Sequence, residues 1–404
     1  GYFRSNDRAI NNFRNLQKQF VMIEQAKRLS NVKEYYFSTK LKEVRAMAAA
    51  GKDIINLGIG SPDLAPPPQV ISALNEAMVN TGAHQYQPYK GTPDFRNAIA
   101  EFYQNHYQVF LDAETEILPL MGSKEGITHI SMAFLNEGDE VLIPNPGYPT
   151  YSSVTELVGA KAVYYDLNAE GNWLPNLEEL AKKDLSKVKL MWVNYPHMPT
   201  GASANEKLFA DLVKFGKENN ILIVNDNPYS FILNDNPKSI LKAEGAKDVV
   251  LELNSLSKSF NMAGWRIGML CGSEKNLNTV LKVKTNMDSG MFYPLQAGAA
   301  AALRLNGDWF SAQNEIYQSR KERVLKLAEA LQCEPEKDQT GMFVWAKVPK
   351  GTNAEAFVDF LLNKYHIFTA PGFIFGSNGE GYIRFSLCAT EENVNRAIKR
   401  IKPA

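Results

Sequence analysis

The sequence has little cysteine and no net charge of either sign. Three cysteines, Cys271, Cys333 and Cys388, lie far apart in the 404 residues, and their number is odd. This argues against a disulfide framework and favours a reducing compartment, so we expect a cytoplasmic protein. Lysine plus arginine and aspartate plus glutamate each number 44, so no overall field draws the chain to nucleic acid or to an anionic membrane.

Metal-binding patterns and membrane-length apolar runs are also missing. The five histidines show no metal-ligand spacing, and we expect no metal site. No apolar run approaches the length of a transmembrane helix, so we expect no membrane association. Apolar residues make up 45% and charged residues 22%, which is ordinary for a globular protein. The length allows two domains, or one large α/β domain with a smaller one appended.

The most informative stretch, residues 254–268, holds a lysine in unusual surroundings. Lys258 is flanked by three serines, with apolar runs at 249–251 and 265–270. Most lysines are solvated surface charges, but a lysine in apolar surroundings has a lowered pKa and can form a Schiff base with a carbonyl. The hydroxyls and Arg266 make an anion site that suits a phosphate. A Schiff-base lysine beside a phosphate site indicates pyridoxal phosphate.

An acid at the end of a buried strand supplies the third group that this cofactor needs. Residues 221–226 have the pattern of a buried parallel strand that ends at Asp226. Ligands in open α/β sheets bind at the carboxyl ends of strands, and a carboxylate there would keep the pyridine nitrogen protonated. Tyr229 follows within reach of the same pocket. The alternative for Asp226 is a turn or helix-capping acid before Asn227-Pro228, which the lysine and arginine disfavour.

Together these motifs resemble those of one family. Ser-x-Ser-Lys at 255–258 with an arginine after it, preceded by Asp-x-x-Tyr at 226–229, is similar to the class I/II aminotransferases of the aspartate aminotransferase fold, fold type I. The resemblance runs from about residue 30 to the C-terminus. It implies that Lys258 carries the Schiff base and is the general acid and base, that Asp226 binds the pyridine nitrogen and Tyr229 the ring hydroxyl, and that Ser255 and Arg266 bind the phosphate.

Other segments agree with this resemblance in order and spacing. Residues 118–126 have the pattern of a strand, a small-residue turn and a helix start, which make a natural phosphate cradle. This string resembles in particular the members similar to LL-diaminopimelate aminotransferase. The family's pattern implies further contacts: Gly122, Ser123 and Lys124 on the phosphate, Tyr148 against the cofactor ring, Tyr86 on the phosphate of the partner subunit, Gly60 beside the substrate, and Arg384 on the substrate's α-carboxylate. Each position also has a plainer interpretation, as a helix cap, a packing aromatic, a strand-end turn or, for Arg384, an internal salt bridge.

Two loops depart from the family pattern. The family usually has two asparagines before Pro-Thr-Gly, the second of which hydrogen-bonds the ring hydroxyl, whereas this chain has His197 and Met198. Methionine cannot donate, so we expect Tyr229 to orient that oxygen alone, or with His197 or water. At 286–296 the chain lacks the arginine with which the aspartate-specific branch binds a distal carboxylate, and Met-Phe-Tyr at 291–293 indicates a more apolar wall.

Strands that alternate with helices predict an α/β fold. We expect a mostly parallel sheet between two helix layers in a large domain at 65–304, and a smaller α+β domain at 305–404. Residues 31–64 are expected to join the small domain, and residues 1–30 to form an N-terminal extension. Helices are expected at 22–50, ending at Gly51, and at 309–331.

These residues favour an enzyme that transfers an amino group between an L-amino acid and a 2-oxo acid on pyridoxal phosphate. The resemblance implies a homodimer with its sites at the subunit interface. A cystathionine-type C–S β-lyase on the same fold is an alternative, since the same groups permit both reactions. A non-catalytic regulator is a third possibility, but no helix-turn-helix extension supports it. The choice of substrate depends on loops near Gly60, Met291 and Phe373.

Overall fold

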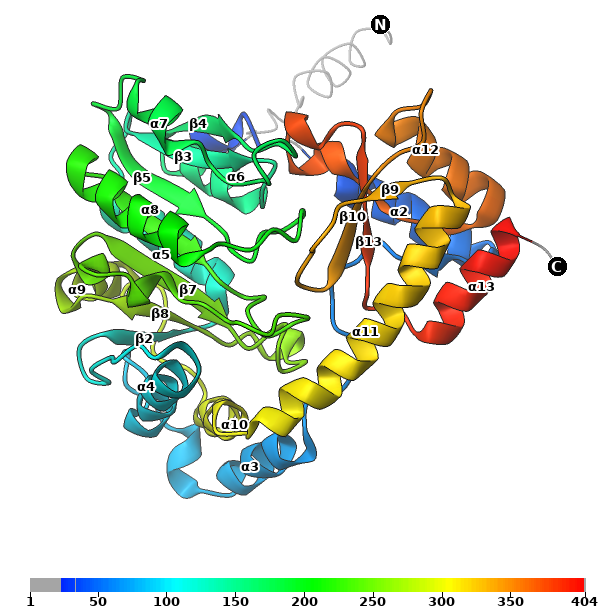
Figure 1. Ribbon diagram of the computed structural model, residues 1–404. Helices are drawn as coiled ribbons and strands as arrows, with labels where there is room; N and C mark the ends of the chain where they lie inside the picture. Colours follow the sequence, from blue (N-terminus) through cyan, green and yellow to red (C-terminus); the bar gives the residue numbers. More distant parts are fainter. Residues whose placement is uncertain (1–22, 33, 403–404) are drawn as a thin grey trace, which may run out of the picture. The chain divides into compact units, whose positions relative to one another are not determined.

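The computed structural model describes residues 23–32 and 34–402 (Figure 1). The chain divides into two units, residues 1–33 and 34–404. The described part of the first unit contains a 3₁₀ turn, η1 (Lys27–Leu29). Residues 1–22, the start of the predicted N-terminal extension, lie outside the described residues.

A seven-stranded sheet is the largest sheet of the second unit. Its strand order is β2-β8-β7-β6-β5-β3-β4, and neighbours run parallel except around β8, which is antiparallel to β2 and β7. The strands are β2 (Ile117–Leu120), β3 (Glu140–Asn145), β4 (Lys161–Asp166), β5 (Val188–Val193), β6 (Leu222–Asp226), β7 (Val250–Ser255) and β8 (Gly268–Gly272). The mostly parallel sheet predicted from the alternation of strands and helices is confirmed.

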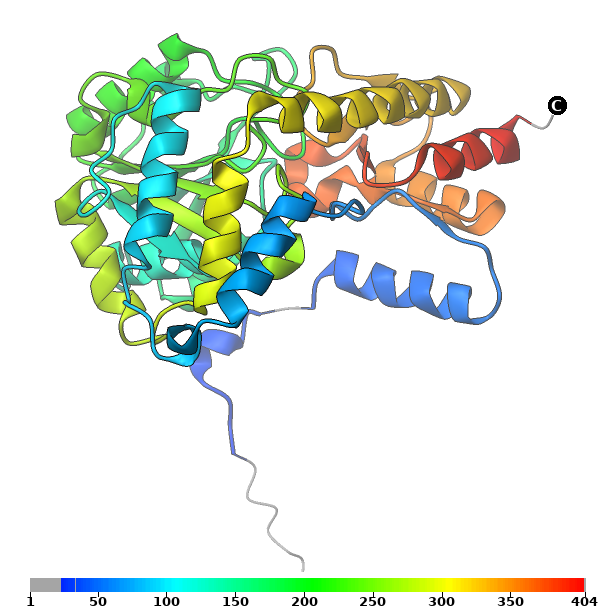
Figure 2. The same cartoon turned by 90° about the horizontal axis from the view of Figure 1, so that it is seen from below.

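Helices cover both faces of this sheet because its strand residues alternate between two apolar cores. Leu190 and Trp192 of β5 pack with apolar residues of α5, α6 and α9, whereas Met191 and Val193 belong to the core that includes α4 and α8. Helices α3, α10 and α4 lie side by side (Figure 2). The helices are α3 (Pro68–Met78), α4 (Pro93–Tyr107), α5 (Ser123–Phe134), α6 (Thr150–Leu157), α7 (Leu177–Ala181), α8 (Glu206–Asn219), α9 (Glu274–Lys284) and α10 (Tyr293–Leu303).

The C-terminal part contains a four-stranded antiparallel sheet of order β12-β13-β10-β9. A short parallel pair, β1 with β11, ties residues 55–56 to this part. The elements are β1 (Ile55–Asn56), β9 (Glu334–Pro335), β10 (Phe343–Lys347), β11 (Ile367–Phe368), β12 (Ala370–Pro371), β13 (Tyr382–Ser386), α2 (Tyr36–Ala49), α11 (Gly307–Ala330), α12 (Ala354–Phe360) and α13 (Glu391–Ile401). The β1–β11 pairing supports the predicted link of residues 31–64 to the small domain, but the domain boundaries stay a prediction.

The two helix predictions had different outcomes. The helix expected at 309–331 is α11. The helix expected at 22–50 is wrong in its first half, because α2 begins only at Tyr36 and the preceding Tyr35 is extended, with ψ 135°. Ser30 and Asn31 lie in this first half, and such side chains compete with helical hydrogen bonding. The helix ends as expected, with Gly51 at φ 88°.

Candidate active site

Five strands of the large sheet bring the predicted site residues to one edge. All five are parallel to one another, so their carboxyl ends lie on the same side, which is where ligands bind in sheets of this kind. Gly122 follows β2, Tyr148 follows β3, Asn194 follows β5, Asp226 ends β6 and Ser255 ends β7.

Lys258 lies in the loop after β7 and is half-buried. Its Nζ donates a 2.6 Å hydrogen bond to the backbone oxygen of Gly60. Burial, helped by Arg384 and Arg266 and opposed by the thiol of Cys388, lowers the pKa of Lys258 to about 8. The amine is therefore partly neutral near physiological pH, as a nucleophile or a proton acceptor must be.

Asp226 is buried, and its two carboxylate oxygens differ. Oδ2 accepts a 2.7 Å hydrogen bond from the hydroxyl of Tyr151, while Oδ1 is buried without a partner among the described residues. Burial raises the pKa of Asp226 to about 6, although the Tyr151 hydrogen bond lowers it and Glu252 raises it. A buried acceptor without a donor is costly, and the free Oδ1 fits the N–H of a protonated pyridine ring.

The predicted phosphate site has the geometry of a cradle. Gly122 precedes α5 with φ +84°, and a Cβ at this position would collide with Nη2 of Arg266. Arg266 reaches this point from after η5 (Ala263–Trp265), with Nη1 donating to Ala263 O at 2.9 Å and to Ser257 Oγ at 3.4 Å. The free N–H groups at the start of α5 and this exposed guanidinium meet where a phosphate would bind. The residues present therefore fit pyridoxal phosphate at both of its ends.

Arg384 lies inside the C-terminal sheet, on β13, and is 6% exposed. Among the described residues it has no carboxylate partner: Nη2 donates to Gly58 O at 2.9 Å, Nη1 contacts Met198 Sδ at 3.3 Å, and Nε is unpaired. The rings of Phe343 and Phe375 lie 3.9 and 4.8 Å from its Cζ. Burial lowers its pKa to about 10. The internal salt bridge considered for this arginine is absent from the described part of the chain, which leaves the guanidinium available for a carboxylate ligand.

The remaining predicted residues take different places. Tyr229 is buried, with its ring 5.9 Å from that of Phe343, and burial raises its pKa. Tyr148 is half-buried, and Gly60 contacts Lys258 as described above. Lys124 is exposed at the start of α5, and Tyr86 is 90% exposed. The structure thus brings together all predicted residues except the exposed Tyr86, whose predicted partner is another subunit.

At residues 197–198, where the chain departs from the family pattern, Met198 contacts Arg384. Its sulfur lies 3.3 Å from Nη1 of the arginine. His197 is buried, its Nδ1 lies 2.6 Å from Thr200 Oγ1, and burial lowers its pKa to about 3. It is therefore a neutral imidazole. Asn194 fills the space between these segments, donating to Asp226 O and accepting from the N–H of Met198.

Sequence reasoning missed Tyr151, Phe343 and Phe375. Tyr151 lies three positions after Tyr148, and this helical spacing puts their rings at 5.5 Å in an edge-to-face contact. That spacing was a usable signal for Tyr151. Phe343 and Phe375 come from segments distant in the sequence from Arg384, and no local pattern pairs them with it.

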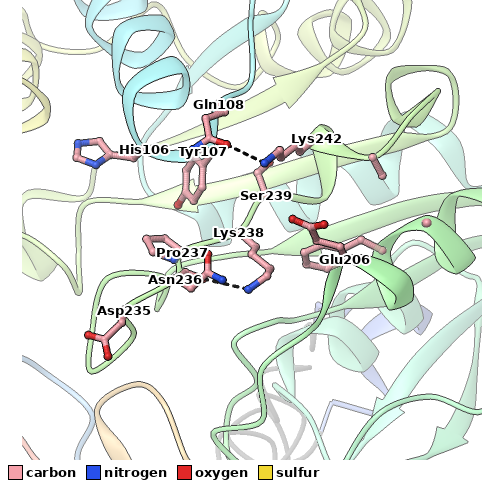
Figure 3. Close-up of a pocket in the computed structure, with 13 residues that line it drawn as sticks. His106, Tyr107, Gln108, Glu206, Asp235, Asn236, Pro237, Lys238, Ser239 and Lys242 are labelled. Atoms are coloured by element: carbon pink, nitrogen blue, oxygen red, sulfur yellow. Dashed lines mark hydrogen bonds between the residues drawn. The ribbon is translucent and has the colours of Figure 1, made fainter.

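Two further polar regions of the described chain are made of residues outside the predicted set. A cavity of about 460 Å³ is lined by residues 106–108, by α8 and by residues 235–243, where Lys242 donates to Gln108 (Figure 3). It contains none of the predicted site residues. Glu125, His129 and Asp288 have the spacing of metal ligands, but the fully buried Lys284 bonds Glu125 at 2.7 Å and Asp288 at 2.5 Å and supplies the positive charge.

Comparison with solved structures identifies the fold. A mutant of aspartate aminotransferase from Thermus thermophilus superposes with a TM-score of 0.87 at 24% identity, over 94% of this chain and 99% of that one. Substrate-bound BacF from Bacillus subtilis gives a TM-score of 0.89 at 37% identity, covering 94% and 97% of the two chains. The fold is that of the aspartate aminotransferases, as the sequence motifs predict.

Sequence comparison defines the family. Residues 52–401 match the family model "Aminotransferase class I and II", so the chain belongs to this family of aminotransferases. LL-diaminopimelate aminotransferase from Dehalococcoides mccartyi is 39% identical over 378 residues, 93% of this chain and 97% of that protein. The enzyme of the same name from Aquifex aeolicus is 38% identical over 383 residues, 94% and 99% of the two chains. Members of the family are generally dependent on pyridoxal phosphate, act on amino and oxo acids, and are typically dimers.

Proposed function

We propose that this aminotransferase uses pyridoxal phosphate, held through Lys258, to move an amino group from an L-amino acid to a 2-oxo acid. One observation carries the proposal. A single backbone segment, residues 58–60, bonds both a lysine of lowered pKa and a buried arginine with no carboxylate partner in the described chain. An amino acid has the two groups that these side chains would serve.

Residues at both ends of the cofactor, its pyridine ring and its phosphate, are assigned to its binding. Asp226 Oδ1 would accept the ring N–H, and Tyr229 would orient the ring hydroxyl. The backbone at Gly122, Ser123 and Lys124, with Ser255 and Arg266, would bind the phosphate, and Tyr148 would pack on the ring. When bound, pyridoxal phosphate supplies an aldehyde for the amine and a ring that stabilises negative charge on the carbon that loses its proton.

Lys258 moves the proton in this scheme. Once the incoming amino acid has displaced it, its Nζ is a free amine with a pKa near 8, within hydrogen-bond reach of Gly60 O. This amine would remove the α-proton of the amino acid and hold it for return to the bound cofactor. Water would then release the 2-oxo acid and leave the amino group on the cofactor, and a second 2-oxo acid would take up that amino group by the reverse path.

Arg384 holds the α-carboxylate during both halves. Its Nη1 contacts only a thioether and its Nε is unpaired, so an incoming carboxylate can accept hydrogen bonds from the guanidinium without breaking a salt bridge. Gly60 lies beside this position, and its close approach to Phe343 leaves no space for a Cβ. Carboxylate capture at Arg384 then aligns the α-carbon with Lys258.

A homodimer is part of the proposal. Tyr86 is 90% exposed, and Met287 and Phe292 are 53% and 43% exposed in the neighbouring loop. His84 and Phe292 place their rings 6.4 Å apart, which joins the two loops into one surface. Burial of this surface against a second copy would bring Tyr86 to the partner's phosphate. The cytoplasmic location also stays a prediction; no helix in the described ranges is long and apolar enough to cross a membrane.

The test is an absorbance spectrum of the purified protein titrated with single amino acids, without any oxo acid. Loss of the long-wavelength band of bound pyridoxal phosphate, with one oxo acid released per site, is expected from a productive donor. Lys258→Ala should lose both this band and at least about 10²–10⁴-fold in rate. Catalytic release of pyruvate and ammonia from cystathionine would instead favour the C–S lyase, and a yellow, active Lys258→Ala would refute the assignment.

A further inference from the structure

A cavity of about 360 Å³ shares two aromatic side chains with the candidate active site. Its walls come from residues 143–152 and 373–377, with Tyr35 and Tyr164. Phe375 is the link, because its ring lies 4.8 Å from Cζ of Arg384. Its backbone oxygen also accepts a 2.8 Å hydrogen bond from the N–H of Gly147, beside Tyr148. The cavity therefore begins next to the positions proposed for the substrate carboxylate and the cofactor ring.

The lining of this cavity is uncharged, and most of its polar groups are already bonded. It includes no Lys, Arg, His, Asp or Glu from the described residues. Asn145 donates to Ser377 Oγ at 2.8 Å and accepts from the N–H of Asn378 at 3.0 Å. Ser152 donates to Pro149 O at 3.1 Å. What remains for a ligand is aromatic and aliphatic surface, together with tyrosine hydroxyls.

The hydroxyl of Tyr35 stays neutral. Burial raises the pKa of Tyr35, and the nearby Tyr148 and Tyr164 raise it further. A neutral phenol can donate or accept a hydrogen bond, but it cannot balance a charge. A carboxylate or an ammonium placed in this cavity would find no counter-ion among the described lining residues, whereas an apolar side chain would be buried against the aromatic wall.

Building on the proposed function, we propose that this cavity receives the side chain of the amino donor and selects large uncharged side chains, aromatic or branched aliphatic. Phe373, Ile374 and Phe375 form its apolar wall. Acidic donors are disfavoured because no cation faces them. LL-diaminopimelate, which carries a second ammonium and carboxylate, is disfavoured for the same reason, although it gives its name to relatives of this chain.

The test compares single-turnover rates for phenylalanine, tyrosine, leucine, aspartate, glutamate and LL-diaminopimelate on the cofactor-loaded protein. The apparent second-order rate constants for phenylalanine, tyrosine and leucine should exceed those for the charged donors by about tenfold or more. LL-diaminopimelate or an acidic donor as the fastest substrate would overturn the side-chain assignment and leave transamination intact. No spectral change with any donor would overturn the proposed function and this inference with it.

A variant pair locates the selectivity in this cavity. Ile374 is half-buried, so an arginine at this position can fold with its guanidinium in the opening. Ile374→Arg should raise the ratio of aspartate to phenylalanine rates by about tenfold or more, because a cation now faces the acidic side chain. Ile374→Met keeps the wall apolar and should leave the ratio near that of the parent. An unchanged ratio in Ile374→Arg would show that the side chain binds elsewhere.

A second inference comes from an ion pair between a buried arginine and an aspartate outside the proposed catalytic groups. Arg320 of α11 is 2% exposed and binds both carboxylate oxygens of Asp63, at 2.7 and 3.0 Å. The same guanidinium donates to Leu387 O at 3.0 Å, just after β13. Asp63 ends the segment whose Gly60 oxygen bonds Lys258 and whose Gly58 oxygen bonds Arg384. The guanidinium of Arg320 thus joins two segments: residues 58–63, which bond Lys258 and Arg384, and the end of β13, which carries Arg384.

We infer that Arg320 and Asp63 are positioning residues for the amino-acid site. Asp63→Asn should lower kcat/KM for the amino donor by about tenfold or more, since a bidentate charged pair is lost. Its affinity for pyridoxal phosphate should not change, because the phosphate cradle and Asp226 lie on other segments. The acid limb of the pH profile assigned to Lys258 should also move, as its Gly60 contact loosens.

Glu391→Gln is the matched control. Glu391 lies 3.6 Å from Nε of the same Arg320 and is not on the segment at 58–63. Both substitutions remove one carboxylate from Arg320, but Asp63→Asn should cost more thermal stability because it weakens two short hydrogen bonds, whereas Glu391→Gln loses only an ion pair at 3.6 Å. Only Asp63→Asn should change kcat/KM and the pH profile. Equal kinetic effects in the two variants, or no kinetic effect in Asp63→Asn, would reduce this pair to a purely structural role.

Discussion

Replacement of Tyr151 by phenylalanine should change the pH dependence of cofactor binding. The Tyr151 hydroxyl donates to Asp226 Oδ2 at 2.7 Å and so stabilises the ionised carboxylate, whose pKa burial raises to about 6. A hydrogen bond to a charged group contributes about 1.5–3 kcal/mol, and one pKa unit corresponds to about 1.36 kcal/mol. In Tyr151→Phe the pKa of Asp226 should therefore rise by about one to two units, to near 7 or above.

The assay is the Kd of the cofactor-free protein for pyridoxal phosphate, measured by fluorescence quenching across pH 5 to 9. Only ionised Asp226 can accept the ring N–H, so affinity should increase as the pH rises through its pKa. Titration of the phosphate and of Lys258 contributes equally in parent and variant, and the difference between their curves isolates Asp226. The midpoint pH of the binding curve should be about one to two units higher in Tyr151→Phe than in the parent.

Tyr165→Phe is the matched control for this experiment. Tyr165 is also buried, and its hydroxyl donates to Trp192 O at 2.6 Å, while the ring of Trp192 stacks on Tyr151. The control thus removes a similar hydroxyl without touching Asp226. An unchanged midpoint in Tyr151→Phe, or an equal displacement in Tyr165→Phe, would refute the view that this hydroxyl sets the charge of Asp226.

Three further predictions follow from the same geometry. Gly122→Ala and Gly138→Ala each place alanine at φ +84°, so both should lose about 1 kcal/mol of stability. Only Gly122→Ala displaces Arg266, so only this variant should bind the cofactor more weakly. Equal Kd values of the two variants for pyridoxal phosphate would contradict this. Arg384→Lys removes the planar fork and should lower kcat/KM for the donor roughly 10–100-fold, with the cofactor Kd unchanged, and steady-state kinetics across several donors measures it. Because burial raises the pKa of Asp226 from 3.8 to about 6, the fold favours its neutral form, and its ionisation lowers stability as the pH rises through this window. Asp226→Asn should therefore raise the unfolding free energy of the cofactor-free protein by about 1–3 kcal/mol at pH 7, with no difference below about pH 4, as urea titration at the two pH values would show.

The parts of the site that could be predicted from the sequence lie at strand ends. An apolar run that stops at an acid locates both the strand and the side chain at its carboxyl edge, as for Asp226. A strand followed by a small-residue turn likewise located the start of α5, whereas Ser255 was assigned by resemblance to the family. Because parallel strands share one edge, local patterns were enough to bring these residues together before any tertiary contact was known.

Contacts between distant segments could not be predicted in this way. The absence of a carboxylate beside Arg384, and the presence of Met198 there, depend on how β13 packs against residues 58 and 198. The prediction of a helix in the residues before α2 was wrong for a different reason. Their polar side chains give no apolar stripe that packing could stabilise, so helix formation there had no tertiary support.

The lone guanidinium of Arg384 has a consequence for the reaction cycle. Every amino acid and every 2-oxo acid carries a carboxylate next to the carbon that reacts. The group that Arg384 is proposed to bind is therefore the same when donor and acceptor alternate. A single binding group can therefore serve four different reactants and products, and it discriminates among none of them. If Arg384 binds the α-carboxylate as proposed, substrate specificity is set by the residues around the substrate's side chain. A change of specificity then requires substitutions among those residues and none at Arg384.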